Sequence, residues 1–227
     1  MQKLSKKIFN HIKIHTQYSI CEGAVKIEVL KDFCKKNAIS AVGLSDSYNL
    51  SGALEFSENL STVGTQPIIG TQILFKFKNN FGLLPLIAKD YEGYKNIIEL
   101  SSMSYLENDN LSDPHCLFDE LLKKNSGIIV LSGSINGLIG KLFNKGLFED
   151  IDIILQKLKE NFPNNFYIEI QRHDDLNEKQ FEIFNLNKSN KYKLPIIATN
   201  EVYYLDKSMY EAHDALMCIG QKMYVND

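Results

Sequence analysis

Three side chains that can bind a metal ion or carry positive charge alternate near the N-terminus of this 227-residue chain. In the stretch FNHIKIHTQYSICEG, His11, Lys13 and His15 alternate with Ile12 and Ile14. This alternation predicts a strand with the isoleucines on one face and the three polar side chains on the other. Because a buried strand face is ordinarily apolar, we expect the polar face to line a cleft.

The two histidines on this face suggest metal binding, but the lysine between them argues against it. Two imidazoles two residues apart on a strand point toward the same place and suit a divalent metal. Here the spacing is His-x-Lys-x-His, and the protonated Lys13 would repel a cation. Two interpretations of Lys13 stay open. In the first, Lys13 takes the position of a metal and pairs with Glu22, Asp46 or Glu201. In the second, its ammonium group extends to solvent.

The elements that must position these residues alternate between short strands and amphipathic helices. Apolar runs predict strands at 41–44, 67–70, 73–78, 83–88, 127–131, 166–170 and 195–199. Helical spacing predicts helices at 24–37, 53–60, 91–105, 118–124, 138–143, 148–162, 177–187 and 207–220. Residues 79–82 predict a hairpin turn and the polar residues 107–115 a loop. This order is typical of parallel βα units.

Polar residues follow the predicted strands in a regular way. They are His15, Asp46, Ser132, His173 and Glu201. In a βα barrel the carboxyl ends of the strands meet at one face, where sites are built. We therefore expect these residues to gather at one end of the fold.

The composition is that of an ordinary globular protein, with 44% hydrophobic and 23% charged residues. A net charge of −3 provides no overall positive field for nucleic acid, so any DNA contact would come from another part of a larger protein. The four cysteines form no CxxC pair and are expected to be reduced thiols of a cytoplasmic protein. No membrane-spanning run or signal peptide is visible. Without a linker or repeat, we expect one domain over residues 1–227, cut from a longer parent protein.

Seven blocks carry a family resemblance that runs in order through essentially the whole chain. They are HIKIHTQYSICEG, AVGLSDSYNLSGALEF, PIIGTQI, LIAKDYEGYKNI, IIVLSGSINGLIG, FYIEIQRH and LPIIATNEVYYLDKSMYEAHDALMCI. Together they resemble the N-terminal PHP (polymerase and histidinol phosphatase) domain of bacterial DNA polymerase III alpha subunits. The resemblance implies an α/β fold, a distorted TIM-like (βα)7 barrel, in front of palm, fingers and thumb regions that this chain lacks.

The resemblance also implies where metal ligands would fall. Metal-binding members hold up to three ions at the barrel mouth. The corresponding positions here are Lys13, His15, Glu22, Asp46, Ser47, Gln72, Leu83, Ser134, Glu201 and Tyr203. His15, Glu22 and Glu201 keep a strong ligand type and would be the ligands if any ion were bound. Three spread ligands with a lysine among them form a poor cage, so we predict a degenerate site with no metal and no catalytic residue.

Two further histidines lie near this cleft by the same resemblance. His11 and His173 do not match the family's principal ligand positions. Neutral imidazole readily fills hydrogen-bonding roles. We interpret both as hydrogen-bonded structural histidines.

The function that the resemblance implies is a part in DNA replication. The parent protein would be a DNA-directed DNA polymerase, a nucleotidyltransferase using Mg²⁺ and dNTPs. This domain would brace the polymerase and dock a separate proofreading 3′–5′ exonuclease subunit. We expect it to need no cofactor and to contact no membrane. DNA would be bound only through the parent chain. One alternative is a residual phosphoesterase or 3′–5′ exonuclease with Zn²⁺ or Mn²⁺ on His15, Glu22, Asp46 and Glu201. Another is a standalone histidinol-phosphate type phosphatase, against which the polymerase-like blocks argue.

Overall fold

The computed structural model describes residues 9–108 and 113–225. Its helices are α1 (Ile27–Asn37), α2 (Ala53–Ser61), α3 (Tyr91–Leu106), α4 (Phe118–Lys123), α5 (Leu138–Asn144), α6 (Phe148–Asn161), α7 (Glu178–Tyr192) and α8 (Tyr210–Gln221), the last preceded by a 3₁₀ turn at Lys207–Met209. Its strands are β1 (Ala41–Gly43), β2 (Asp46–Ser47), β3 (Gln66–Ile68), β4 (Gly70–Phe77), β5 (Asn80–Ala88), β6 (Cys116–Leu117), β7 (Ile128–Leu131), β8 (Phe166–Ile170) and β9 (Ile196–Ala198). The α/β alternation matches the prediction.

The main sheet is mixed rather than wholly parallel. Its order is β2-β4-β5-β7-β8-β9, with β6 beside β4, while β1 and β3 form a separate parallel pair. The pairings β2–β4, β7–β8 and β8–β9 are parallel, whereas β4–β5 and β5–β7 are antiparallel. The reversal comes from the short connection between β4 and β5, since such a connection allows only an antiparallel hairpin. The prediction of parallel βα units is therefore correct for part of the sheet.

The N-terminal segment around Ile14 contacts residues next to both edge strands of the main sheet, β2 and β9. Ile14 forms a bridge to Leu44 on one side and to Val202 on the other. The backbone N–H of Ile14 donates to Gly43 O at 2.9 Å, and that of His15 donates to Val202 O at 2.8 Å. Leu44 lies just before β2 and Val202 lies shortly after β9, at the two ends of the order. These isolated bridges link the segment to residues beside both ends of the sheet, an arrangement compatible with the predicted distorted barrel of about seven strands.

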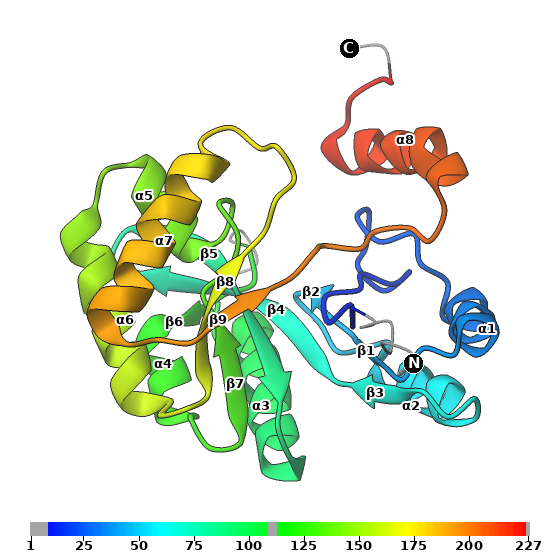
Figure 1. The fold of residues 1–227 in the computed structure, drawn as a ribbon, viewed down its shortest axis with the longest axis horizontal. Coiled ribbons are helices and arrows are strands. Elements are labelled where there is room, and N and C mark those ends of the chain that lie inside the picture. Colours follow the sequence, from blue (N-terminus) through cyan, green and yellow to red (C-terminus); the bar gives the residue numbers. More distant parts are fainter. Residues whose placement is uncertain (1–8, 109–112, 226–227) are drawn as a thin grey trace, which may run out of the picture.

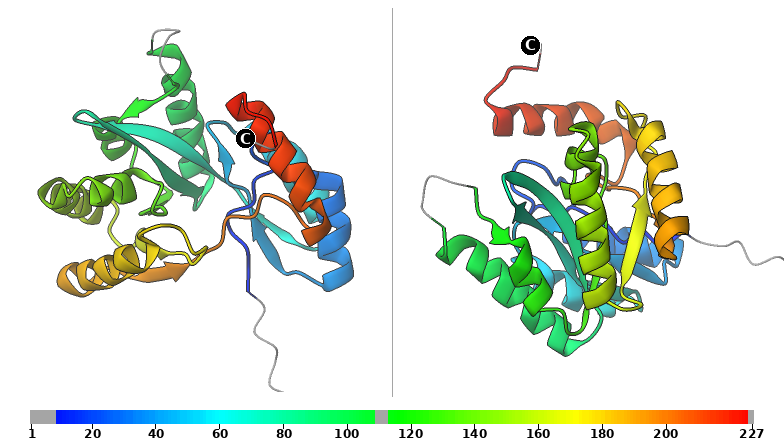
Figure 2. Two further views of the ribbon diagram at one scale, coloured as in Figure 1. Left: turned by 90° about the horizontal axis from the view of Figure 1, so that it is seen from above. Right: turned by 90° about the vertical axis from the view of Figure 1, so that its left-hand side faces the viewer.

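Two hydrophobic cores flank this junction. The larger packs residues of β4, β5, β7 and β8 against α3 to α7, and includes Phe75, Leu84 and Phe166. The smaller packs α1, α2 and β1 around Ile14, Phe56 and Leu60. Figures 1 and 2 show these two groups of elements on opposite sides of the molecule, with α8 lying over the N-terminal side. The junction between the cores is where the polar strand ends meet.

Most differences from the predicted elements have local causes. Asp46, expected to follow the strand predicted at 41–44, forms β2 with Ser47 because the two residues pair with Thr71 and Gln72 of β4. The two-residue strand β6 is too short to show periodicity. Helix α3 begins where predicted because the Asp90 side chain accepts a hydrogen bond from Gly93 N at 2.9 Å. Of the predicted loop 107–115, residues 109–112 lie outside the described residues.

Candidate functional site

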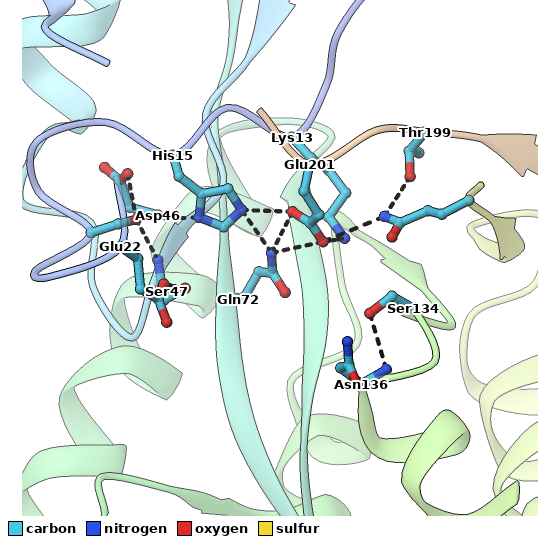
Figure 3. A network of polar contacts seen from close by, with 12 residues as sticks. Lys13, His15, Glu22, Asp46, Ser47, Gln72, Ser134, Asn136, Thr199 and Glu201 are labelled. Carbon is cyan, nitrogen blue, oxygen red and sulfur yellow. Dashed lines mark hydrogen bonds and ion pairs between the residues drawn. The ribbon is translucent and has the colours of Figure 1, made fainter. Parts of the chain in front are cut away.

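Lys13 lies at the centre of a buried ion cluster at the junction (Figure 3). Its side chain is 1% exposed, and its Nζ lies 3.0 Å from Glu169 Oε1 and also contacts Glu201 Oε1. His15 Nε2 lies 2.6 Å from Glu201 Oε2. Lys13 and His15 therefore share one face of the segment, as the alternation predicted. Of the two interpretations of Lys13, extension to solvent is wrong and pairing with Glu201 is what the structure shows.

Amides and a hydroxyl complete the hydrogen bonding of this cluster. Gln72 Nε2 lies 3.2 Å from His15 Nε2 and donates to Glu201 Oε2 at 3.2 Å. Gln171 Nε2 donates to Glu169 Oε1 at 2.8 Å, and the Thr199 hydroxyl donates to the same oxygen. These donors come from β4 and from the ends of β8 and β9. The cluster therefore connects the N-terminal segment with β4, with β8 and with the residues after β9.

Glu169 is the member of this cluster that sequence reasoning missed. It is fully buried in β8, whose sequence is FYIEI. A lone carboxylate inside an otherwise apolar strand was the available signal, because a buried acid requires a partner. Its Oε1 has three partners, whereas its Oε2 is buried without a hydrogen-bond partner among the described residues.

The ion pairs shift the pKa values of their members. Burial alone would lower the pKa of the Lys13 amine, but the charges of Glu169 and Glu201 outweigh burial and raise it. Burial alone would raise the pKa of the Glu201 carboxyl, but the charge of Lys13 and the hydrogen bond from His15 hold it well below its usual range. Both groups are therefore charged at neutral pH.

Asp46 lies on the other side of His15 and is held by neutral donors. Its carboxylate accepts hydrogen bonds from Thr16 N at 2.6 Å, from the Thr16 hydroxyl at 2.7 Å and from the Ser19 hydroxyl at 2.9 Å. Burial raises the pKa of Asp46 despite these bonds. Nearby, the Ser47 hydroxyl donates to Glu22 Oε2 at 2.7 Å. Neither Glu22 nor Asp46 contacts Lys13, so those two candidate pairings are not made.

A cavity of about 920 Å³ borders the cluster and is lined in part by Gln72, Gln171 and Glu201. The predicted site residues that line it are His11, Glu22, Ser47, Gln72, Leu83, Ser134, His173, Glu201 and Tyr203. Lys13, His15 and Asp46 are buried and do not line it. The Tyr203 ring stacks on His15, with the ring centroids 4.4 Å apart. Burial, with the charges of Glu201 and Glu22, raises the pKa of the Tyr203 hydroxyl.

The structure does not bring every predicted residue into the polar network. Ser134 lies apart with Asn136, whose backbone N–H donates to its hydroxyl at 3.3 Å (Figure 3). His173 is exposed, and its backbone N–H donates to Glu178. The ring of His11 contacts Phe9, and its Nδ1 is buried without a hydrogen-bond partner among the described residues. The hydrogen-bonded role predicted for His11 is therefore wrong at this atom.

The chemistry of this donor set does not fit a divalent metal ion. The Lys13 ammonium group already makes ion pairs with Glu169 and Glu201, so a second cation beside these carboxylates would be repelled. Ser47, Gln72 and Tyr203, at positions where the resemblance places metal ligands, are neutral side chains that line the cavity. Within residues 9–108 and 113–225, no group of three or more histidine, cysteine or acidic side chains is arranged to hold a metal ion.

The fold and this strand-end cluster define an α/β protein of the PHP type. Residues 11–173 match the family model described as the PHP domain, so the chain belongs to the PHP domain family. It is 34% identical, over 93% of its length, to the DNA polymerase III subunit alpha of Rickettsia felis, and 33% identical, over 96% of its length, to that of Caulobacter vibrioides. The chain spans 18% and 20% of those two proteins, about a fifth of their length.

A solved structure supports the same fold. The chain superposes with a TM-score of 0.56 on a protein of Bifidobacterium adolescentis for which metal-dependent phosphoesterase activity has been proposed. The sequences are 11% identical, and the superposition covers 86% of this chain and 87% of the other. This likeness confirms the PHP-type fold. In the part of the chain that the structure describes, no helix is both long and apolar enough to cross a membrane.

Proposed function

We propose that residues 1–227 form the PHP domain of a DNA polymerase III alpha chain, and that this domain works in DNA replication without phosphoesterase chemistry. The supporting comparison is the identity of about a third with alpha subunits over nearly the whole chain. The polymerase activity, with its Mg²⁺ and dNTPs, belongs in this proposal to the longer chain in the cytoplasm. DNA would be bound by that chain.

The observation that carries the proposed loss of chemistry is the buried Lys13 ammonium group. It makes ion pairs with Glu169 and Glu201 at the strand ends where a PHP enzyme would need its metal. A metal that activates water requires an open coordination position and deprotonated ligands. A buried lysine provides neither, and it leaves Glu201 engaged on both oxygens.

The role that remains is structural. We propose that the domain braces the polymerase core and docks the separate proofreading 3′–5′ exonuclease subunit. The supporting argument is that an alpha chain with an inactive PHP site depends on a partner for proofreading. The 227-residue chain should then bind that exonuclease subunit in solution and should not extend a primed template by itself.

Metal content and activity of the purified chain test this proposal. After incubation with zinc and manganese and removal of free ions, elemental mass spectrometry should find far less than one ion per chain. A chelator should leave the thermal melt unchanged, and 3′-end hydrolysis of single-stranded DNA should be absent. One or more tightly held ions with hydrolysis would instead establish the metal-dependent phosphoesterase, the class proposed for the Bifidobacterium protein.

A further inference from the structure

We propose that the outward face of helix α8, made of Ala212, Ala215, Ile219 and the following Met223, packs against the rest of the DNA polymerase III alpha chain. The proposal rests on the function proposed above, and it names the surface through which this domain braces the polymerase. The surface is separate from the strand-end cleft, because none of these four residues lines the cavity there.

The first argument is that α8 buries none of its side chains in the part of the chain that the structure describes. Every other described α-helix buries at least two. An isolated helix of 12 residues is marginal in water, and helices in proteins gain most of their stability by packing an apolar face. Helix α8 therefore lacks, within the described residues, the packing that ordinarily stabilises a helix.

The second argument is which side of α8 rests on the domain. His213 Nε2 donates a hydrogen bond to Glu22 O at 2.8 Å, and the His213 ring packs against the ring of Tyr204. Seven residues later, Gly220 lies so close to Cys21 that an added Cβ atom would be 2.6 Å from the Cys21 Cβ. Residues seven apart share one side of a helix. The side of α8 that rests on the domain is therefore marked by a histidine and a glycine.

The third argument is that the apolar stripe of α8 lies on a different side. Ala212, Ala215 and Ile219 follow the three- and four-residue spacing of a core-facing stripe, and helix geometry places them roughly 100–160° around the axis from His213. Ile219 is 71% exposed and Met223 is 48% exposed. Figures 1 and 2 show α8 at the edge of the molecule, with no other drawn helix or strand beyond it. The stripe therefore faces away from both hydrophobic cores.

The rest of the alpha chain is the occupant because it is large and is covalently attached. The chain spans 18% of the Rickettsia felis alpha subunit and 20% of the Caulobacter vibrioides one, so most of such a protein lies outside it. In the proposed function that remainder continues from the end of α8. A tethered segment binds at a high effective concentration. A second copy or a separate subunit would instead lose translational and rotational freedom on binding the stripe.

The first experiment measures side-chain protection in native proteins. The 227-residue chain and the full-length alpha chain that contains it are exposed to hydroxyl radicals, with an added peptide as the dose reference. Mass spectrometry then gives the oxidation rates of Ile219 and Met223. We expect both rates to be several-fold lower in the full-length chain, because its remainder covers the outward face of α8.

The second experiment compares two variants, each made in both chains. Ile219→Glu is the test, and Ile183→Glu is the matched control, because Ile183 is also an exposed isoleucine of a helix, α7. In the 227-residue chain neither should change the melting temperature much, since both positions are exposed. In the full-length chain, Ile219→Glu should speed tryptic cleavage after Lys222 several-fold, and Ile183→Glu should leave that rate at the native value.

Equal oxidation of Ile219 and Met223 in the two native chains would overturn the inference, and so would equal cleavage of the two full-length variants. Protection that requires the separate exonuclease subunit, or that rises with the concentration of the 227-residue chain, would overturn it in favour of that occupant. If Ile219→Glu prevents folding of the full-length chain, the oxidation rates of the native proteins still decide. A full-length chain that does not extend a primed template would overturn the proposed function instead, so the two proposals fail separately.

Discussion

Two buried carboxylate sites lie on either side of His15, and they hold their charge in different ways. Glu201 is held by the Lys13 ammonium group and by His15, whereas Asp46 is held by the Thr16 backbone, the Thr16 hydroxyl and the Ser19 hydroxyl. Burial acts on both, yet the pKa of Glu201 is lowered and that of Asp46 is raised. The difference shows that a nearby cation outweighs the cost of burial here, and that three neutral donors do not.

The comparison also explains what each site contributes to the fold. The Lys13 cluster joins the N-terminal segment to β8 and to the residues after β9, which are distant in sequence. Asp46 in β2 instead fixes the turn that follows the same segment, through Thr16 and Ser19. The first site should therefore stabilise the contacts of the N-terminal segment with β8 and the residues after β9, and the second should stabilise the local turn after that segment.

The largest expected effect comes from removing the cation. Lys13→Met fills a similar volume but leaves Glu169 and Glu201 buried without a counter-charge. Breaking a buried ion pair in this way costs about 3–5 kcal/mol of the free energy of unfolding. Urea denaturation at neutral pH measures it.

The matched control for this variant is Lys95→Met, which breaks an exposed pair with Glu92. That change should leave the free energy of unfolding nearly unaltered, because exposed ion pairs contribute little. A Lys13→Met chain as stable as the Lys95→Met control would show that the Lys13 ion pairs do not stabilise the fold.

The second prediction concerns Glu201→Gln and its pH dependence. At neutral pH we expect a loss of about 1.5–3 kcal/mol, the range for hydrogen bonds to charged groups, because Lys13 keeps Glu169 as a partner. The pKa of Glu201 is lowered by folding, so its stabilising effect is present above the unfolded value of 4.5 and is lost as the pH falls through the folded value. The difference between native and variant should therefore shrink below pH 4.5 in urea melts recorded across pH.

Asp46 contributes to the pH dependence with the opposite sign. Its folded pKa is raised above the unfolded value of 3.8, so folding takes up a proton between the two values and stability falls as the pH rises through that window.

For the Glu201→Gln prediction, a difference in stability between the native chain and the variant that stays constant from pH 7 to pH 3 would contradict the assigned ion pair.

The sequence predicted most members of the Lys13 cluster, but it did not predict Glu169. The alternation around Ile14 correctly placed Lys13 and His15 on one face, and the resemblance correctly brought Glu201 beside them. Glu169 was missed because a single acid in an apolar strand shows no spacing that names its partner. The partner lies 156 residues away in sequence, and only the tertiary fold brings the two together.

The antiparallel part of the sheet was also harder to predict. Apolar runs give the same pattern in parallel and antiparallel strands, so the pairing of β5 with β7 does not follow from periodicity. The hairpin between β4 and β5 could be predicted because its turn residues are recognisable. The N-terminal segment predicted as a strand joins its neighbours only through isolated bridges at Ile14, and no turn residue signals those contacts.

The smallest expected effect sharpens the Asp46 side of the comparison. Thr16→Val keeps the shape of the side chain but removes the hydroxyl that donates to Asp46 Oδ2 at 2.7 Å and accepts from Tyr18 N at 3.2 Å. We expect a loss of about 1–2 kcal/mol in the free energy of unfolding, since two further donors remain on Asp46. Urea denaturation at neutral pH measures this loss.

The same exchange at an exposed position is the control for Thr16→Val. In Thr62→Val the lost hydroxyl donates to the backbone of Asn59 at the surface, so stability should change much less. Because a donor to the ionised form is lost, the pKa of Asp46 should rise further in Thr16→Val. The destabilisation caused by Thr16→Val should then become smaller as the pH falls through the pKa of Asp46. A destabilisation that grows at low pH would show that the Thr16 hydroxyl does not stabilise the ionised Asp46 carboxylate.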